Sequence, residues 1–112
     1  NMKISKKKRV FVVGSGKNIL KIKHVADIKL NDNEQITIKY QKSNYDFVKK
    51  NWGFYATPSI NYRLKKEGFK TALVKNLQKR VYLMVVHKKK ISIFKKYCKI
   101  HKQKIVQWLD NF

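Results

Sequence analysis

Cys98 and His101 stand one helical turn apart, so their side chains could bind a metal ion together or form a thiol–imidazole pair. A zinc site needs three or four ligands, and His24 and His87 would have to converge on the pair from elsewhere in the fold. Catalysis by the pair would also need an orienting partner, and acidic residues are scarce in this chain. Both residues fall on an apolar stripe, so burial in the core is enough to explain them. We therefore expect no catalytic residue, no metal ion and no cofactor.

A second motif resembles a phosphate-binding loop, with the sequence Gly14-Ser15-Gly16-Lys17. The first glycine of such a loop is missing at the required distance, Asn18 replaces the Ser or Thr that follows the lysine, and no helical pattern comes next. A tight turn between two strands explains the segment.

A pocket for one phosphate or carboxylate is predicted within residues 52–64. Thr57 followed by Pro58 is typical of a helix start, which would present backbone amides and the positive end of the helix dipole to an anion. The candidate residues are Tyr55, Thr57, Ser59, Asn61 and Arg63. The alternative is that Thr57 only begins a helix and that the aromatic residues belong to the core.

Basic residues form short clusters along the chain, with Tyr and Phe residues between them. A surface for single-stranded nucleic acid needs this combination, because cations neutralise phosphates and aromatic rings stack on bases. The clusters are Lys6, Lys7, Lys8 and Arg9; Lys49 and Lys50; Lys65 and Lys66; Lys88, Lys89 and Lys90; and Lys95 and Lys96. The alternative is a solvated surface over a core of aromatic side chains.

The whole chain is strongly basic, with 28 Lys and Arg against 6 Asp and Glu and a formal net charge of +22 over 112 residues. Charge of one sign attracts polyanions and destabilises the compact state by self-repulsion. An AT-rich genome would explain the lysines but would supply acidic residues too. Because Arg9, Arg63 and Arg80 are the only arginines, bidentate reading of guanine is restricted and weak sequence selectivity is expected. Signatures of known nucleic-acid modules are missing from the sequence.

Length and composition predict a single folded domain over residues 1–112, with a basic N-terminal segment over 1–9. Hydrophobic residues make up 43% of the chain and recur along all of it, which a disordered basic tail would not show. Met2 follows Asn1, so we expect Asn1 to be left over from expression.

The location is expected to be cytoplasmic. No secretory leader precedes the first predicted strand, and a lone Cys98 excludes an internal disulfide and fits a reducing compartment. The longest apolar run, residues 81–86, is far shorter than the roughly 20 residues that cross a bilayer, so no transmembrane segment is expected.

Alternating apolar and polar residues, bounded by turn residues, predict strands along most of the chain. The predicted strands are 10–13, 18–23, 36–41, 54–56, 69–75 and 80–87. Capping patterns predict two short helices, one over 44–52 and one that starts at Thr57 and ends at Gly68.

From about residue 90 to residue 110 the apolar period becomes that of a helix. The stripe is Ile91, Phe94, Tyr97, Cys98, His101, Ile105, Trp108, Leu109 and Phe112. Ile93 and Ile100 fall outside the stripe and indicate a second contact surface. We expect an α+β domain in which a mostly antiparallel sheet of five or six short strands is covered on one face by this C-terminal helix and one or two short helices.

The C-terminal half resembles a small family of uncharacterised bacterial proteins, which are often encoded among genes for surface-polysaccharide or sugar biosynthesis. The residues that carry the resemblance are Trp52-Gly53-Phe54-Tyr55-Ala56-Thr57-Pro58-Ser59-Ile60-Asn61, Arg63-Leu64, Gly68-Phe69-Lys70-Thr71-Ala72-Leu73-Val74 and Ile105-Val106-Gln107-Trp108-Leu109-Asp110. The family has no established chemistry, so the resemblance implies no catalytic residue. It implies a place in a glycan pathway, where the anion would be a sugar nucleotide, an acidic sugar or an acidic partner enzyme.

Two functions follow as hypotheses. The favoured one is a small basic, non-enzymatic protein that binds nucleic acid or another polyanion, with weak sequence selectivity, through a lysine-rich surface. The alternative is an accessory or catalytic component of surface-polysaccharide synthesis that binds an anionic sugar near residues 52–64. Attachment to an anionic membrane ranks last, because the apolar stripe that it would need is required for the core. The sequence leaves an acidic protein partner open and does not determine the oligomeric state.

Overall fold

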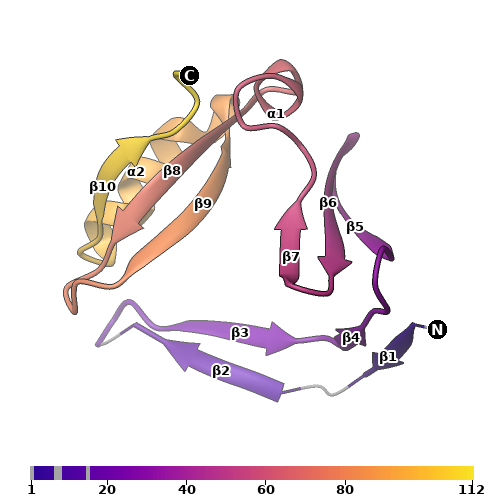
Figure 1. Cartoon of the computed structure of the whole chain (residues 1–112). Helices are drawn as coiled ribbons and strands as arrows, with labels where there is room; N and C mark the ends of the chain where they lie inside the picture. Colours follow the sequence, from indigo (N-terminus) through magenta and orange to yellow (C-terminus); the bar gives the residue numbers. More distant parts are fainter. Residues whose placement is uncertain (1, 7–8, 15) are drawn as a thin grey trace. The chain divides into compact units, whose positions relative to one another are not determined.

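The computed structural model describes residues 2–6, 9–14 and 16–112, of which 49% lie in strands and 16% in helices (Figure 1). Contacts between residues divide the chain into two compact units, Asn1–Thr57 and Pro58–Phe112. We call them the N-terminal unit and the C-terminal unit. Each has its own sheets, and every strand pairing in them is antiparallel.

The described residues of the N-terminal unit form three small sheets. In order, these are β1 (Lys3–Ser5) with β4 (Asp27–Lys29), β2 (Arg9–Val13) with β3 (Leu20–His24), and a meander of β5 (Gln35–Tyr40), β6 (Ser43–Lys50) and β7 (Gly53–Ala56). Two-residue loops join the meander strands, at 41–42 and at 51–52. Gln41 in the first loop adopts a positive φ of 54°, and Gly53 directly after the second takes a φ of 143°. Local turn chemistry therefore fixes the register of this sheet.

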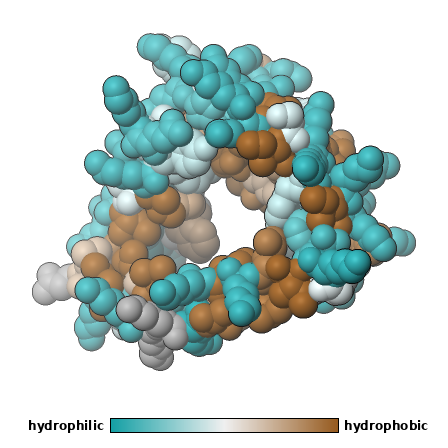
Figure 2. All heavy atoms as spheres, turned by 180° about the vertical axis from the view of Figure 1, so that it is seen from behind, coloured by the Kyte–Doolittle hydropathy of each residue, from teal (hydrophilic) through white to brown (hydrophobic). Residues whose placement is uncertain are grey.

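The pair of strands β2 and β3 forms a ribbon that is exposed on both faces. Cross-strand pairs Phe11–Ile22 and Val13–Leu20 give it one apolar face, and all four side chains are exposed. Figure 2 shows hydrophobic residues, in brown, exposed along the lower edge of the view. The opposite face alternates valines of β2 with lysines of β3.

The C-terminal unit is a three-stranded sheet with a helix packed on one face. Its strand order is β10 (Lys104–Trp108), β8 (Phe69–Lys75) and β9 (Val81–His87), so β8 is central. The helical segments are α1 (Arg63–Lys66), the 3₁₀ turn η1 (Lys88–Lys90) and α2 (Ile91–Ile100). Ala72, Val74 and Cys98 form the buried centre, and side chains of β9, α2 and β10 pack around them.

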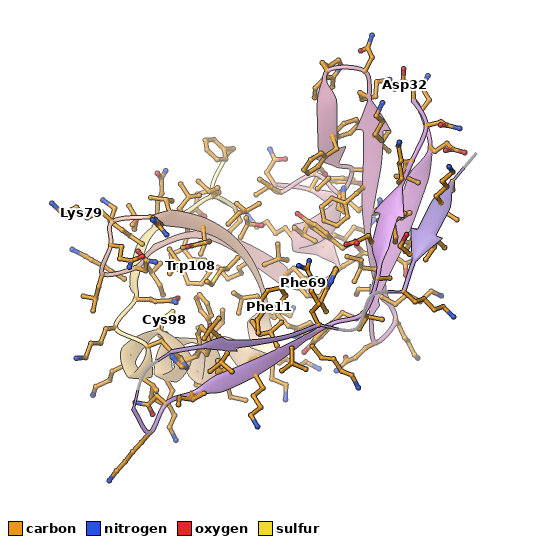
Figure 3. All side chains as sticks on the ribbon, turned by 90° about the horizontal axis from the view of Figure 1, so that it is seen from below. Phe11, Asp32, Phe69, Lys79, Cys98 and Trp108 are labelled. Atoms are coloured by element: carbon orange, nitrogen blue, oxygen red, sulfur yellow. The ribbon has the colours of Figure 1, made fainter. Side chains whose placement is uncertain are left out.

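Figure 3 labels Cys98 on α2 and Trp108 on β10, which both belong to this core. The strand β8 also contacts α1, whose Leu64 is 1% exposed. Burying such a side chain contributes roughly 1.5–3 kcal/mol. Packing of α1 against β8, and of α2 against the sheet, therefore stabilises this unit.

All six predicted strands are present. The structure has strands at 9–13, 20–24, 35–40, 53–56, 69–75 and 81–87, within a few residues of the predicted bounds. A turn separates the last two of these strands, with Lys79 at a φ of 65°. These predictions rest on alternation and turn residues, which act over a few positions.

The helix predicted over 44–52 is wrong, because this segment is the strand β6. The spacing of Ser43 and Asp46 fits a capping box, but the Asp46 carboxylate instead accepts a hydrogen bond from the Thr37 hydroxyl across the sheet, at 2.6 Å. Tyr45, Phe47 and Val48 are residue types that favour strands. The helix predicted from Thr57 begins only at Arg63 and is four residues long.

The long C-terminal helix is also wrong, and with it the predicted α+β fold. The helix α2 ends at Ile100, Lys102 takes a φ of 53°, and the chain returns as β10 beside β8. Apolar residues at positions 105 and 108 still pack on the core, but from a strand. The described chain is mostly β, with several small sheets and only one helix longer than four residues.

Candidate polyanion-binding surface

The predicted basic clusters are divided between the two units. Lys6, Arg9, Lys49 and Lys50 belong to the N-terminal unit, and Lys65, Lys66, Lys88, Lys89, Lys90, Lys95 and Lys96 belong to the C-terminal unit. Lys7, Lys8 and Asn1 lie outside the described residues. The clusters have to be considered unit by unit.

The described basic clusters of the N-terminal unit contact neighbouring side chains. Lys49 forms an ion pair with Asp32, which lies in the loop before β5. Asp32 is labelled in Figure 3. The Nζ of Lys50 donates to Asn33 Oδ1 at 2.6 Å, and the Arg9 guanidinium lies 5.3 Å from the centre of the Phe11 ring. An acid therefore compensates part of the charge at Lys49, whereas Lys50 and Arg9 keep theirs.

The C-terminal unit carries a dense positive surface. Eight lysines of η1, α2 and β10 and of the turn between them are all exposed, and no Asp or Glu occurs anywhere in residues 88–109. We call this set the α2 lysine surface: Lys88, Lys89, Lys90, Lys95, Lys96, Lys99, Lys102 and Lys104. In α2, Lys95, Lys96 and Lys99 follow the helical spacing of the solvent side, while Cys98 marks the buried side.

The acidic residues of this unit lie outside the lysine surface. Glu67 Oε2 is 3.7 Å from Arg63 Nε, on α1 and the turn after it. Asp110 is 4% exposed, and its carboxylate lies 3.9 Å from Lys70 Nζ while its backbone oxygen accepts from Lys65 Nζ at 3.2 Å. The charge of the α2 lysine surface is therefore uncompensated by acids from its own segment.

Sequence reasoning missed three members of this surface, Lys99, Lys102 and Lys104. The prediction used runs of adjacent lysines, and these three are isolated in the sequence. The signal that finds them is the absence of acidic residues over 88–109, combined with the helical spacing of the apolar stripe.

The placement of Lys88, Lys89 and Lys90 is electrostatically unfavourable. They lie at the N-terminal end of α2, where the helix dipole is positive, and neither an acidic side chain in the first turn nor a side-chain cap at Lys90 offsets them. Each cation near a helix N-terminus costs about 0.3–1 kcal/mol at low ionic strength. An anion bound here would relieve this repulsion.

Replacing all three by glutamine, K88Q/K89Q/K90Q, is therefore expected to stabilise the protein. We expect a rise of about 1 kcal/mol in the free energy of unfolding, or about 4 °C in melting temperature, at low salt. The matched control is K99Q/K102Q at the other end of α2, where cations are favourable and removal should lower the melting temperature slightly. Thermal denaturation followed by circular dichroism decides it, and a fall in stability of the triple variant would contradict this electrostatic argument.

The anion pocket was predicted from a helix that starts at Thr57, and the structure has no helix start there. The Thr57 amide donates to the Asp46 carbonyl at 2.9 Å, and its hydroxyl lies 3.4 Å from Asp46 Oδ2. The amide of Arg63 donates to Ser59 Oγ at 2.8 Å. Thr57 and Tyr55 belong to the N-terminal unit, whereas Ser59, Asn61 and Arg63 belong to the C-terminal unit. The predicted row of free helix-start amides at 57–59 is therefore wrong. The pocket itself stays a prediction.

Cys98 is buried, and burial raises the pKa of its thiol. A raised pKa keeps the sulfur protonated, which is the opposite of what a nucleophilic cysteine needs. The histidines have local partners: the His101 ring lies 4.6 Å from that of Tyr97, and His24 Nε2 lies 3.0 Å from the Asp27 carboxylate. Within the described residues, no three His, Cys, Asp or Glu side chains come together as a metal site would require.

A hollow of about 710 Å³ lies in the N-terminal unit and adjoins an apolar one of about 220 Å³. Both hollows are lined by Ile28, Leu30 and Lys49, and the smaller one also by Phe47 and Phe54. Lys49 is the single member of the predicted polyanion set there. The lining of the smaller hollow fits packing between β4 and the meander, whereas Lys29, Asn31 and Asp32 add polar groups to the larger one.

Neither of the described α-helices is both long and apolar enough to cross a membrane. This chain matches no protein-family model, no curated protein and no solved structure. Any function therefore has to be argued from the residues and their geometry.

Proposed function

We propose that this protein binds nucleic acid, or a polyanion of similar charge density, through the α2 lysine surface and without strong sequence selectivity. The observation that supports it is a set of eight exposed lysines in a 22-residue segment, 88–109, that contains no acidic residue. Solvated lysines elsewhere on proteins are usually interspersed with acids, which keep the surface field small. Here that compensation is missing.

The physical basis is counterion release. Each lysine that neutralises a phosphate displaces a condensed cation, so affinity depends on the number of contacts and falls steeply with salt. Lysine ammonium groups act as point charges and do not form the bidentate contacts that identify a base. The expected dissociation constant is that of non-specific binding, on the order of 10⁻⁴–10⁻⁶ M at physiological salt.

Anisotropy titrations of labelled single-stranded RNA and DNA, at about 50 mM and about 200 mM salt, test this proposal. If about five lysines contact phosphates, the affinity for a single strand should fall about 100-fold between the two conditions. Two oligonucleotides of unrelated sequence should bind within a few-fold of each other. An absence of binding at the lower salt concentration would refute the proposal, and so would an affinity that salt leaves unchanged.

The alternative function in surface-polysaccharide synthesis rests on the family resemblance and on the predicted pocket near Arg63. Its test is a thermal-shift measurement with anionic sugars and sugar nucleotides. A stabilising sugar whose effect Arg63→Ala abolishes would favour this function over the first, and no shift across such a panel would count against it.

A further inference from the structure

We infer that the tip of the β6–β7 hairpin stacks an unpaired base, so that the polyanion is single-stranded nucleic acid. This inference rests on the proposed function and deepens it by naming the form of the ligand. The feature that carries it is a pair of exposed aromatic rings, Trp52 in the loop and Tyr55 on β7, which we call the aromatic platform.

The two rings of the aromatic platform are stacked on each other and remain open to solvent. Their centroids are 6.1 Å apart with an angle of 17° between the ring planes. Trp52 is 67% exposed and Tyr55 is 45% exposed. Mutual stacking orients both rings without burying them, which leaves flat apolar surface available to a third planar group.

Packing of the sheet does not account for this exposure. Elsewhere in the same meander, Tyr45 and Phe47 of β6 are half-buried and pack edge to face at 5.1 Å. A fully buried tryptophan would remove 150–250 Å² of its surface from water, in order of magnitude. At the tip of the hairpin Trp52 stays exposed, so the free energy of burying it is not gained. A side chain kept exposed in this way is typical of a binding surface.

A cation lies on the same face as the platform. In the β6–β7 register, Val48 pairs with Tyr55 and Lys50 pairs with Gly53. Side chains two positions apart share a face of a sheet, so Lys50 and Tyr55 project on the same side, about 7 Å apart along the strands. The amide oxygen of Asn33 holds the Lys50 ammonium group at 2.6 Å and leaves its charge uncompensated.

Aromatic surface and an adjacent ammonium group match the two parts of an unpaired nucleotide. The base presents a π face, which every base has, and the phosphate presents the negative charge. In a duplex the base faces are already stacked on one another and are inaccessible to the platform. Stacking of this kind is tolerant of sequence, in agreement with the weak selectivity that the scarcity of arginine predicts.

The test compares binding of a single strand and of a duplex of equal length by variants with intact folds, checked by circular dichroism. Trp52→Ala and Tyr55→Ala should each weaken single-strand binding about 10-fold and leave duplex binding within a factor of two. Phe54→Ala is the matched control, because Phe54 is 74% exposed on the opposite face of the same hairpin. It should leave both affinities unchanged.

Tryptophan fluorescence supplies a second readout that does not depend on the alanine variants. Single-stranded oligonucleotide should quench the emission of the wild type, and Trp52→Phe should bind nearly as well but lose most of the quenching. Wild-type single-strand affinity in Trp52→Ala would overturn the inference while leaving the proposed function intact. Failure of the wild type to bind either form at low salt would instead overturn the proposed function.

Discussion

Trp108→Ala is expected to lower the free energy of unfolding by about 3–5 kcal/mol. Trp108 packs on the buried cluster of Ala72, Val74 and Cys98, and its ring lies edge to face with Phe94 at 6.1 Å. The Lys70 ammonium lies 4.5 Å from the ring centre, so the substitution removes a cation–π contact as well. Since small domains have only about 5–15 kcal/mol of stability, the variant is expected to lose a large fraction of it.

Urea denaturation followed by circular dichroism measures this effect. Phe112→Ala is the matched control, because it also removes an aromatic side chain near the C-terminus, but one that is 82% exposed. Its stability should stay within about 0.5 kcal/mol of the wild type. If Trp108→Ala were as stable as Phe112→Ala, Trp108 would have no place in the core described above.

Neutralising three lysines of α2, as K95Q/K96Q/K99Q, is expected to weaken binding of single-stranded nucleic acid about 100-fold at about 0.1 M salt. Each phosphate contact to a single strand contributes about 0.7 to the slope of log affinity against log salt, so the slope should fall by about 2. Glutamine preserves helix propensity, and the three positions are exposed, so the fold should be retained. Anisotropy titrations over several salt concentrations give both quantities.

The control removes the same charge from the N-terminal unit, as K3Q/K17Q/K29Q, at three exposed positions. Its affinity should fall less than 10-fold and its salt slope should change by less than 1. Equal losses in the two variants would show that binding follows the total charge of the chain, and would contradict the assignment of the α2 lysine surface.

The strands were predictable because their signals are local. β2 and β3 alternate or cluster β-branched residues on either side of a glycine-rich turn, and β8 and β9 do so on either side of a turn at 76–79. Such patterns require only that the chain reverse within a few residues. Where the signal was equally local but ambiguous, as at 44–52, a capping pattern outweighed strand-forming side chains and the prediction failed.

The strand β10 was unpredictable for a different reason. Its pairing with β8 joins residues about thirty positions apart, and the apolar residues Ile105 and Trp108 fit a helical stripe as well as a strand. The helix α2 ends at Ile100, and Lys102 just after it takes a left-handed conformation, where glycine is the usual signal and lysine gives none. Tertiary packing on Val74 and Ala72, which the sequence does not reveal, decides the outcome.

The candidate sites were predictable to different degrees. Composition alone indicated a positive surface, and runs of adjacent lysines identified Lys95 and Lys96 of α2 but not Lys99. The aromatic platform could not be predicted, because a helix over 44–52 would place Trp52 and Val48 on one apolar face. In the structure, Trp52 occupies a loop and stacks on Tyr55 instead.

The β2–β3 ribbon has a consequence for how the protein behaves at high concentration. Among the described residues each of these strands has one partner, so the outer rims of the ribbon offer backbone groups to another strand, and its apolar face invites such contact. Lys17, Lys21 and Lys23 act as gatekeepers that keep two copies apart by repulsion. A polyanion that neutralises these lysines removes the repulsion and allows copies of the protein to associate. The turbidity of the solution should therefore peak near charge equivalence and fall again when polyanion is in excess.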